Sequence, residues 1–283
     1  MHDENYIRFS LDTRKLGLQS FINLYPLPCF HVGARQSDVL FIKHHLKRIK
    51  EDPNARWIYM GDGGECVTMF STGNVWEQLY NPQQQVEILL DLLRPIKSKG
   101  LFMIRGNHGK RVFKDSGMSF DKTLALALGL PYIGVNAFCN LRVNDASYDL
   151  YCHHGIDSGV SLQAKVNKAE QFRGFINTDS IITAHSHIAQ DLQPAALLEL
   201  NNHEQRVDTK LRYQYICGSG YDSRTGYAVE KGYSPLLPAF IVIEYSGRKV
   251  GGHWPKKQES RVFRSDGQHR VTGDYGHYKC EDG

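Results

Sequence analysis

The sequence predicts an α/β fold built around an open β-sheet, and two observations carry this prediction. Short apolar runs typical of strands alternate along the chain with segments whose apolar residues recur at helical spacing. Metal-ligand side chains follow four of these runs, which are Trp57–Met60, Leu101–Ile104, Tyr148–Tyr151 and Ile181–Ala184. Because the carboxyl ends of strands in an open α/β sheet border one crevice, we expect these side chains to converge on a centre with more than one metal ion.

The first half of the chain alternates predicted strands and helices. Ser37 and Asp38 offer an N-cap for a helix that ends near Asp52, and Pro82 suits the first turn of a second helix that Gly100 closes. A stretch rich in Gly, Thr and Asn separates the two helices and reads as a long loop at the mouth of the site. The predicted elements are strands at 21–28, 57–60 and 101–104, helices at 39–52, 82–99 and 120–128, and the loop at 66–81.

The second half is predicted to be richer in strands and to complete the sheet. The predicted strands are 137–143, 148–152, 181–184, 213–217, 239–245 and 249–254, with one helix at 165–175. Residues 256–283 are polar and without periodicity. We therefore expect a single domain over residues 1–255, followed by a polar C-terminal extension over residues 256–283.

The composition is that of an ordinary soluble protein and excludes several classes. The chain has 283 residues, 41% of them hydrophobic and 23% charged, and no apolar run approaches the roughly 18 residues that span a bilayer. The first residues are acidic and lack the pattern of a signal peptide, so a cytoplasmic protein is expected. Six scattered cysteines indicate free thiols rather than a disulfide framework. The net charge of +4 tolerates a polyanionic partner without requiring one.

Five short motifs contain the candidate metal-ligand and proton-donor side chains. They are Cys29–Gly33, Gly61–Glu65, Gly106–Gly109, His153–Gly155 and His185–His187. Ligands of the Asp, Asn and His types suit Mn²⁺, Zn²⁺, Fe²⁺ or Ni²⁺ better than Ca²⁺. Two such ions about 3.5 to 4 Å apart can hold a phosphate group and activate water for hydrolysis. An imidazolium that protonates the leaving oxygen would lower the barrier further, and His108 stands beside the candidate ligand Asn107.

In this order, the five motifs resemble those of the calcineurin-like metallophosphoesterase family, including its compact bacterial and phage-type members. The resemblance covers about residues 24 to 245. It implies a four-layer α/β/β/α sandwich of two mixed β-sheets flanked by helices, two divalent ions of Mn, Zn, Fe or Ni, and His108 as the general acid. The implied metal ligands are His31, Asp62 and His187 for one ion, and Asp62, Asn107, His154 and His185 for the other, with Asp62 bridging. Cys29 is a further candidate ligand, at the position of the family's first aspartate.

Three positions depart from the family pattern. Cys29 replaces the first aspartate, Gly109 replaces an acid, and Ala184 replaces the glycine before His185. A thiolate at Cys29 would favour softer ions such as Zn²⁺ or Fe²⁺, and the alternative is a weak or absent first metal. Adjacent residues of an extended segment point to opposite faces, so only one of His153 and His154 should enter the site. His154 stands directly before Gly155 and matches the family pattern better.

Several further residues are open to two interpretations. Glu65 is either a hydrogen-bond partner of a ligand histidine or a solvated loop acid. Lys110, Arg111 and Arg224 are candidates for substrate binding, and the aromatic and basic segment 218–233 is either a nucleotide-binding wall or a surface loop. The pair His44 and His45 is predicted to lie on the surface of the first helix.

We therefore expect a hydrolase that cleaves a phosphodiester by attack of a metal-bound hydroxide, with a nuclease or nucleotide phosphodiesterase as its class. The expected partner is a phosphate-ester substrate, nucleic acid or nucleotide, and no membrane. Two alternatives stay open: a phosphomonoesterase that acts on phosphoprotein or nucleotide, and a catalytically degenerate protein that binds nucleic acid. Manganese is one of the expected metals.

Overall fold

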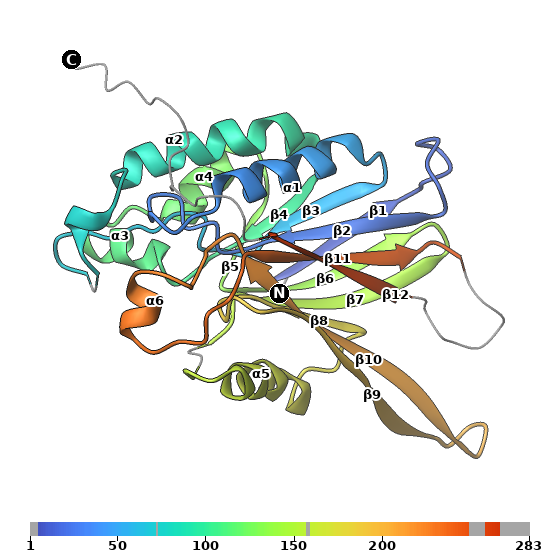
Figure 1. The fold of residues 1–283 in the computed structure, drawn as a ribbon. Coiled ribbons are helices and arrows are strands. Elements are labelled where there is room, and N and C mark those ends of the chain that lie inside the picture. Colours follow the sequence, from blue (N-terminus) through green and yellow to red (C-terminus); the bar gives the residue numbers. More distant parts are fainter. Residues whose placement is uncertain (1–4, 72, 157–158, 249–257, 267–283) are drawn as a thin grey trace.

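A large mixed β-sheet flanked by helices forms the fold, as the computed structural model describes it for residues 5–71, 73–156, 159–248 and 258–266 (Figure 1). The strands are β1 (Tyr6–Leu11), β2 (Phe21–Leu27), β3 (Ala55–Tyr59), β4 (Gly100–Ile104), β5 (Tyr132–Gly134), β6 (Asn136–Val143), β7 (Ala146–His153), β8 (Ser180–Thr183), β9 (Ala189–Asn201), β10 (Arg206–Ser219), β11 (Ala239–Ser246) and β12 (Gln258–Arg264). The helices are α1 (Val39–Glu51), α2 (Pro82–Leu93), α3 (Gly109–Ser116), α4 (Phe120–Leu128), α5 (Leu162–Glu170) and α6 (Tyr227–Glu230), with 3₁₀ turns η1 (Val75–Glu77), η2 (Arg94–Lys99) and η3 (Gln171–Gly174).

The strands follow the order β1-β6-β7-β8-β10-β11-β2-β3-β4-β5, with β9 paired to β10 and β12 paired to β11. The neighbours β2, β3 and β4 run parallel, as do β7 and β8. The junction between β10 and β11 is short, since only Gly218 with Phe240 and Ser219 with Ala239 pair there. The outer parts of β9 and β10 form a long hairpin that projects from the body of the molecule (Figure 1).

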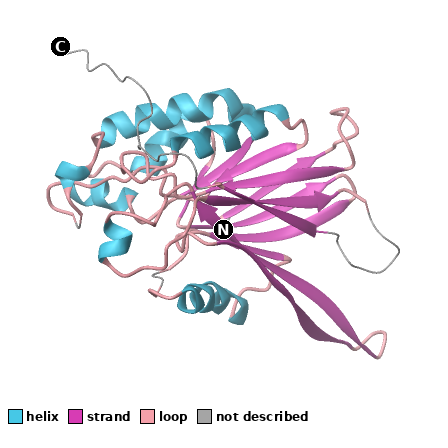
Figure 2. Ribbon diagram, in the orientation of Figure 1, coloured by secondary structure: helices cyan, strands magenta, loops and turns pink. Residues whose placement is uncertain are grey.

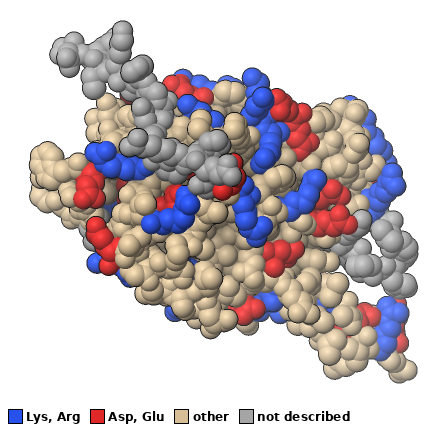
Figure 3. Space-filling model, viewed as in Figure 1, with Lys and Arg blue, Asp and Glu red and all other residues tan. Residues whose placement is uncertain are grey.

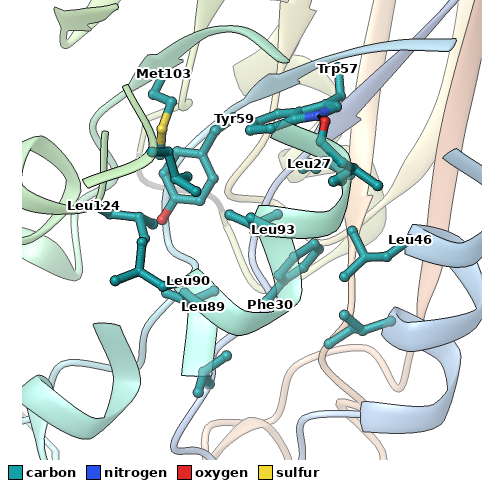
Figure 4. Close-up of a cluster of buried hydrophobic side chains, with 14 of the residues drawn as sticks. Leu27, Phe30, Leu46, Trp57, Tyr59, Leu89, Leu90, Leu93, Met103 and Leu124 are labelled. Carbon is teal, nitrogen blue, oxygen red and sulfur yellow. Dashed lines mark hydrogen bonds between the residues drawn. The ribbon is translucent and has the colours of Figure 1, made fainter. Parts of the chain in front are cut away.

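Helices α1, α2 and α4 cover one face of the β2–β4 part of the sheet (Figure 2). As predicted, Asp38 caps α1 by accepting a hydrogen bond from the Phe41 backbone N–H at 3.0 Å, and Pro82 lies in the first turn of α2. Asn81 adds a capping box with Gln84 at the start of α2. Leucines of these helices pack on the large aromatic side chains of β3 (Figure 4). The residues of this core that Figure 4 labels include Leu46, Trp57, Tyr59, Leu89, Leu93 and Leu124.

A second core draws side chains from both halves of the sheet. It joins Ile22, Ile58 and Phe102 to residues of β6, β7 and β10, such as Leu141 and Tyr215. Helix α5 lies on the other side of the β7–β8–β10 part, away from α1 and α2 (Figure 1). The sequence predicted every strand that contributes a motif, and their carboxyl ends lie at one edge.

Other elements differ from the prediction or were not anticipated. The polar N-terminal segment forms β1, which pairs with β6, and α3 and β9 are also additional. Within the predicted extension, residues 258–264 form β12 on β11, whereas residues 256, 257 and 267–283 lie outside the described residues. The strand predicted at 249–254 lies outside them as well.

The buried polar residues correct one expectation. His44 is exposed as predicted, but the prediction for His45 is wrong, because its imidazole is buried on the inner face of α1 against Phe240 at a ring-centroid distance of 4.5 Å. The helical period places residue 45 on the same face as Phe41 and Ile42. The predicted free thiols are confirmed for Cys29, Cys66, Cys139, Cys152 and Cys217, all of which are buried and unbridged.

The lengths of the helices and the distribution of charged side chains describe the surface. Within the part of the chain that the structure describes, no helix is both long and apolar enough to cross a membrane. On the face that Figure 3 draws, Lys and Arg are interspersed with Asp and Glu rather than gathered in one basic patch.

Candidate metal centre

The candidate ligands meet at the carboxyl ends of the strands, as the sequence predicted. Cys29 and His31 follow β2, Asp62 follows β3, and Asn107 follows β4. His154 follows β7, and His185 and His187 follow β8. Ligand atoms of Cys29, His31 and His187 lie within 4.8 Å of one another, as do those of Cys29, Asp62 and His154. Cys29 therefore lies between the two groups, fully buried.

His31 presents one ring nitrogen to the centre. Its Nδ1 lies 2.8 Å from Glu65 Oε2 and its Nε2 lies 3.0 Å from Nε2 of His187. Since a carboxylate can only accept, Nδ1 is the donor, and Nε2 is the ring nitrogen that faces the centre. Two ring nitrogens that face each other in this way can share a cation.

His154 is oriented by a backbone carbonyl in the same manner. Its Nδ1 donates to the Met60 carbonyl at 2.6 Å, which leaves Nε2 facing Asp62 Oδ2 at 2.8 Å and Asn107 Oδ1 at 2.9 Å. Burial alone would lower the pKa of His154, but the Asp62 carboxylate raises it overall. Three acceptor groups thus converge on one point, an arrangement that either a proton or a metal cation stabilises.

Asp62 is the shared carboxylate of the cluster. Burial would raise the pKa of its carboxyl, but the imidazoles of His154 and His108 hold that pKa well below its usual range. Its Oδ1 accepts the His108 backbone N–H at 2.8 Å, and its Oδ2 faces His154. Ligand atoms of Asp62, His31 and His108 also lie within 4.8 Å of one another, so Asp62 adjoins His31 as well as His154.

His108 stands at the edge of the cluster with its ring partly exposed. Its Nδ1 donates to the Glu65 carbonyl at 2.9 Å, and its Nε2 lies 3.9 Å from Asp62 Oδ2. Burial lowers the pKa of His108, while the charges of Asp62 and Glu65 act in the opposite direction. With Nδ1 fixed by the carbonyl, Nε2 is the ring atom that can exchange a proton with a molecule in the cavity.

Glu65 organises three neighbours, so the sequence alternative of a solvated loop acid is not what the structure has. Its carboxylate accepts from His31 and lies 3.2 Å from Arg111 Nη1, and its carbonyl also accepts from Arg111 at 2.8 Å. Burial would raise the pKa of Glu65, but His108, His31 and Arg111 together lower it to about 2.

The backbone of the ligand loops is strained. Five of the candidate ligands have left-handed backbone, with φ of 51° at Cys29 and His31, 57° at Asp62, 67° at His185 and 62° at His187. Such conformations are costly outside glycine and gather at functional sites. A Cβ on Gly106 would collide with Asp62 Oδ1, so glycine is required where this loop passes the carboxylate.

A cavity of about 630 Å³ opens above the cluster. Its base carries His31, Asp62, Asn107, His108, His185 and His187. Val67, Asn74 and Gln78 line one side, which confirms the predicted loop at the mouth of the site. Tyr221 and the α6 segment line another side, so the aromatic and basic segment faces the cavity.

The three candidate substrate-binding residues occupy different places. Arg111 lines the cavity and is held by Glu65. Lys110 is exposed and Arg224 forms a bidentate pair with Asp222, and neither is among the described residues that line the cavity. Lys165 lines it from α5, although the sequence indicated only a helix there. Helical spacing gives no signal for a lysine that turns into a site.

Comparisons with known proteins found resemblances to solved structures alone. No protein-family model matches the chain, and no curated protein matches it. Solved structures that resemble it include Vps29 of Entamoeba histolytica, at 13% identity and a TM-score of 0.39, covering 87% of this chain and 100% of that one. The calcineurin-like phosphoesterase YfkN of Bacillus subtilis is 11% identical, with a TM-score of 0.40 and coverage of 87% and 91%. A phosphatase of Mycoplasma pneumoniae is also 11% identical, with a TM-score of 0.39 and coverage of 88% and 94%. At these identities and TM-scores the resemblances carry no argument about function, so the function must be inferred from the site residues.

Proposed function

We propose that this chain is a calcineurin-like metallophosphoesterase, a metal-dependent hydrolase of phosphate esters. The observation that carries the proposal is a cluster in which Nε2 of His31 faces Nε2 of His187, and Nε2 of His154 faces Asp62 and Asn107. His108 lies beside this cluster, with its backbone N–H bonded to Asp62. A merely structural cluster of this kind has no need for a cavity above it, for strained ligand loops, or for a partly exposed imidazole at its edge.

The donor set fits divalent transition ions. Imidazole nitrogens, a carboxylate, an amide oxygen and a thiol suit Mn, Zn, Fe or Ni, whereas Ca²⁺ and Mg²⁺ prefer oxygen alone. Cys29, His31, Asp62 and His187 would hold one ion, and Asp62, Asn107, His154 and His185 the other. When bound, such ions supply positive charge for the phosphate group and lower the pKa of water.

The chain's own side chains have distinct tasks in this reaction. His108 would deliver a proton from Nε2 to the departing oxygen, since its Nδ1 is engaged with the Glu65 carbonyl. Glu65 fixes the ring of His31 and the guanidinium of Arg111. Arg111 thereby presents a positive charge to the cavity. Cys29 is buried beneath the cavity, so as a ligand it would act from the protein side.

We favour a phosphodiester, from nucleic acid or a nucleotide, as the substrate. The cavity extends from the candidate ligands to a wall that carries Tyr227, Lys231 and Tyr233, which supports a second substituent on phosphorus. A monoester needs no such room on its far side.

The test compares a chromogenic diester with its monoester. Metal-stripped protein is reloaded with Mn²⁺, Zn²⁺ or Fe²⁺, and the rates of both esters are measured beside the His108→Ala variant. Faster diester cleavage that requires both a metal and His108 supports the proposal. Faster monoester cleavage would transfer the assignment to a phosphomonoesterase, and lack of turnover with every metal contradicts both.

We also infer a four-layer sandwich of two mixed sheets within a single domain, which the pairing of β12 with β11 extends past the predicted boundary at residue 255. Two observations support it: the short β10–β11 junction and the core that draws side chains from both halves of the sheet. A cytoplasmic location stays a prediction.

A further inference from the structure

Lys165 is a buried cation in the wall of the cavity. It belongs to α5, and its residue is only 6% exposed, whereas Lys168 on the same helix is exposed. Its Nζ donates to the Ser186 carbonyl at 3.0 Å and lies 5.5 Å from the centre of the Tyr233 ring. Ser186 stands between the candidate ligands His185 and His187, so this ammonium borders the metal centre.

The charge of Lys165 has no acidic partner in the part of the chain that the structure describes. None of the ion pairs among those residues includes it, and burial is the cause that lowers its pKa. Burial of an unpaired ammonium is costly, and a solvent-filled cavity relieves that cost only in part. An anion in the cavity would relieve it further.

The hydrogen-bonding capacity of Lys165 points the same way. An ammonium has three donors, and the Ser186 carbonyl takes one of them. The same ammonium lines the cavity beside His185 and His187, where the remaining donors can reach a bound molecule. The cavity is where a substrate phosphate would be held if the proposed function is correct.

We propose that Lys165 binds a non-bridging oxygen of the reacting phosphate group. This inference rests on the proposed phosphoesterase function and adds to it a substrate-binding residue from α5. The ammonium supplies a charge-assisted hydrogen bond to the phosphate, and its bond to Ser186 holds it in place.

The competing role is purely positional, in which Lys165 only fixes the Ser186 carbonyl and thereby the loop of His185 and His187. The two roles differ in metal content. If Lys165 contacts phosphate, its replacement should leave the metal content unchanged. If it holds the ligand loop, its replacement should lower the affinity for metal.

The experiment uses metal-reloaded wild type, Lys165→Met, Lys165→Gln and the matched control Lys168→Met. Three quantities are measured for each: metal content, KM and kcat for bis(4-nitrophenyl) phosphate, and the affinity for inorganic phosphate. The diester probe carries one phosphate group, so a change in its KM reports on the reacting phosphate. Lys165→Gln keeps a donor without the charge and serves if the Met variant does not fold.

We expect Lys165→Met and Lys165→Gln to retain metal and to bind inorganic phosphate about 10- to 100-fold more weakly, with a matching rise in KM. Lys168→Met should behave as wild type. Unchanged phosphate affinity would overturn the inference, and so would a loss of metal that accounts for the loss of phosphate binding. If the wild type hydrolyses neither ester but phosphate binding still depends on Lys165, the proposed function fails and the anion site stands.

Discussion

The metal centre and the wall that faces it across the cavity are built on different principles. Five of the candidate ligands have left-handed backbone in loops that follow strands, and the imidazoles of His31 and His154 are each fixed through Nδ1. The wall comes from the short helix α6 and its flanks, where Tyr227 is 46% exposed and Lys231 is exposed. If the proposed function is correct, the buried centre carries out the reaction and the exposed wall contacts the rest of the substrate. Variants of the centre should therefore lower kcat, and variants of the wall should raise KM.

The largest effect is expected at the shared carboxylate. Asp62→Asn keeps the shape of the side chain but removes the charge that faces His154 and both proposed ions. Loss of several kcal/mol of charge stabilisation corresponds to a fall in kcat of about 10³-fold or more. Metal content and steady-state rates measure the change, and full metal content with undiminished kcat would contradict a role for Asp62 in the centre.

His108→Gln tests the proton donor without removing a ligand. We expect kcat to fall by about 10²- to 10⁴-fold while the metal content stays at the wild-type level. The loss should be larger for a phenyl ester, whose leaving group needs the proton, than for a 4-nitrophenyl ester. Equal losses for both leaving groups would remove His108 from the role of general acid.

Cys29→Asp addresses the soft ligand at the base of the centre. Burial and the Asp62 charge raise the pKa of the Cys29 thiol well above its usual value, so only a bound cation would make it a thiolate. We expect two-metal occupancy to be retained and activity to shift toward Mn²⁺ by about tenfold. Activity titrated with Mn²⁺ and Zn²⁺ measures the shift, and an unchanged preference means that Cys29 is not a ligand.

Tyr227→Ala tests whether the wall formed by α6 and its flanks binds the substrate. If the ring packs on a base of the substrate, its removal should raise the KM for a dinucleotide by about tenfold with little change in kcat. The matched control is Tyr6→Ala, which removes a tyrosine of similar exposure from the distant strand β1. A fall in kcat with unchanged KM would contradict the expectation that variants of the wall affect substrate binding alone.

The smallest effect concerns stability and lies outside both regions. Burial, and then the charge of Arg48, lower the pKa of His45 to about 3, whereas an unfolded histidine has a pKa of about 6.5. The unfolded state therefore binds the proton first, and the stability present above pH ~6.5 is lost progressively as the pH falls toward 3. His45→Phe should make the change in unfolding free energy between pH 7 and pH 4.5 smaller by about 2 kcal/mol, as measured in urea. Identical pH dependence in both proteins would place the titration elsewhere.

The same contrast explains what the sequence could predict. Candidate ligands stand immediately after apolar runs, so the strand ends and Asp62 could be located from local pattern, whereas the choice of His154 over His153 needed the family pattern. Strand β1 is held by β6, more than 120 residues away, and β9 carries Pro194 in an edge strand, so neither has a local signal. The role of Lys165 depends on how α5 docks against the His185–His187 loop, and the left-handed backbone of the ligands depends on that packing as well.

The spacing of the candidate ligands has a consequence for the order of folding. They extend from Cys29 to His187, and only neighbours within a single motif are close in sequence. Large loops must close before His31 meets His187. An early, partly folded chain therefore has few ligands close enough together to bind an ion. Metal should then slow unfolding of the finished protein rather than speed its folding, because the cluster is among the last features to assemble.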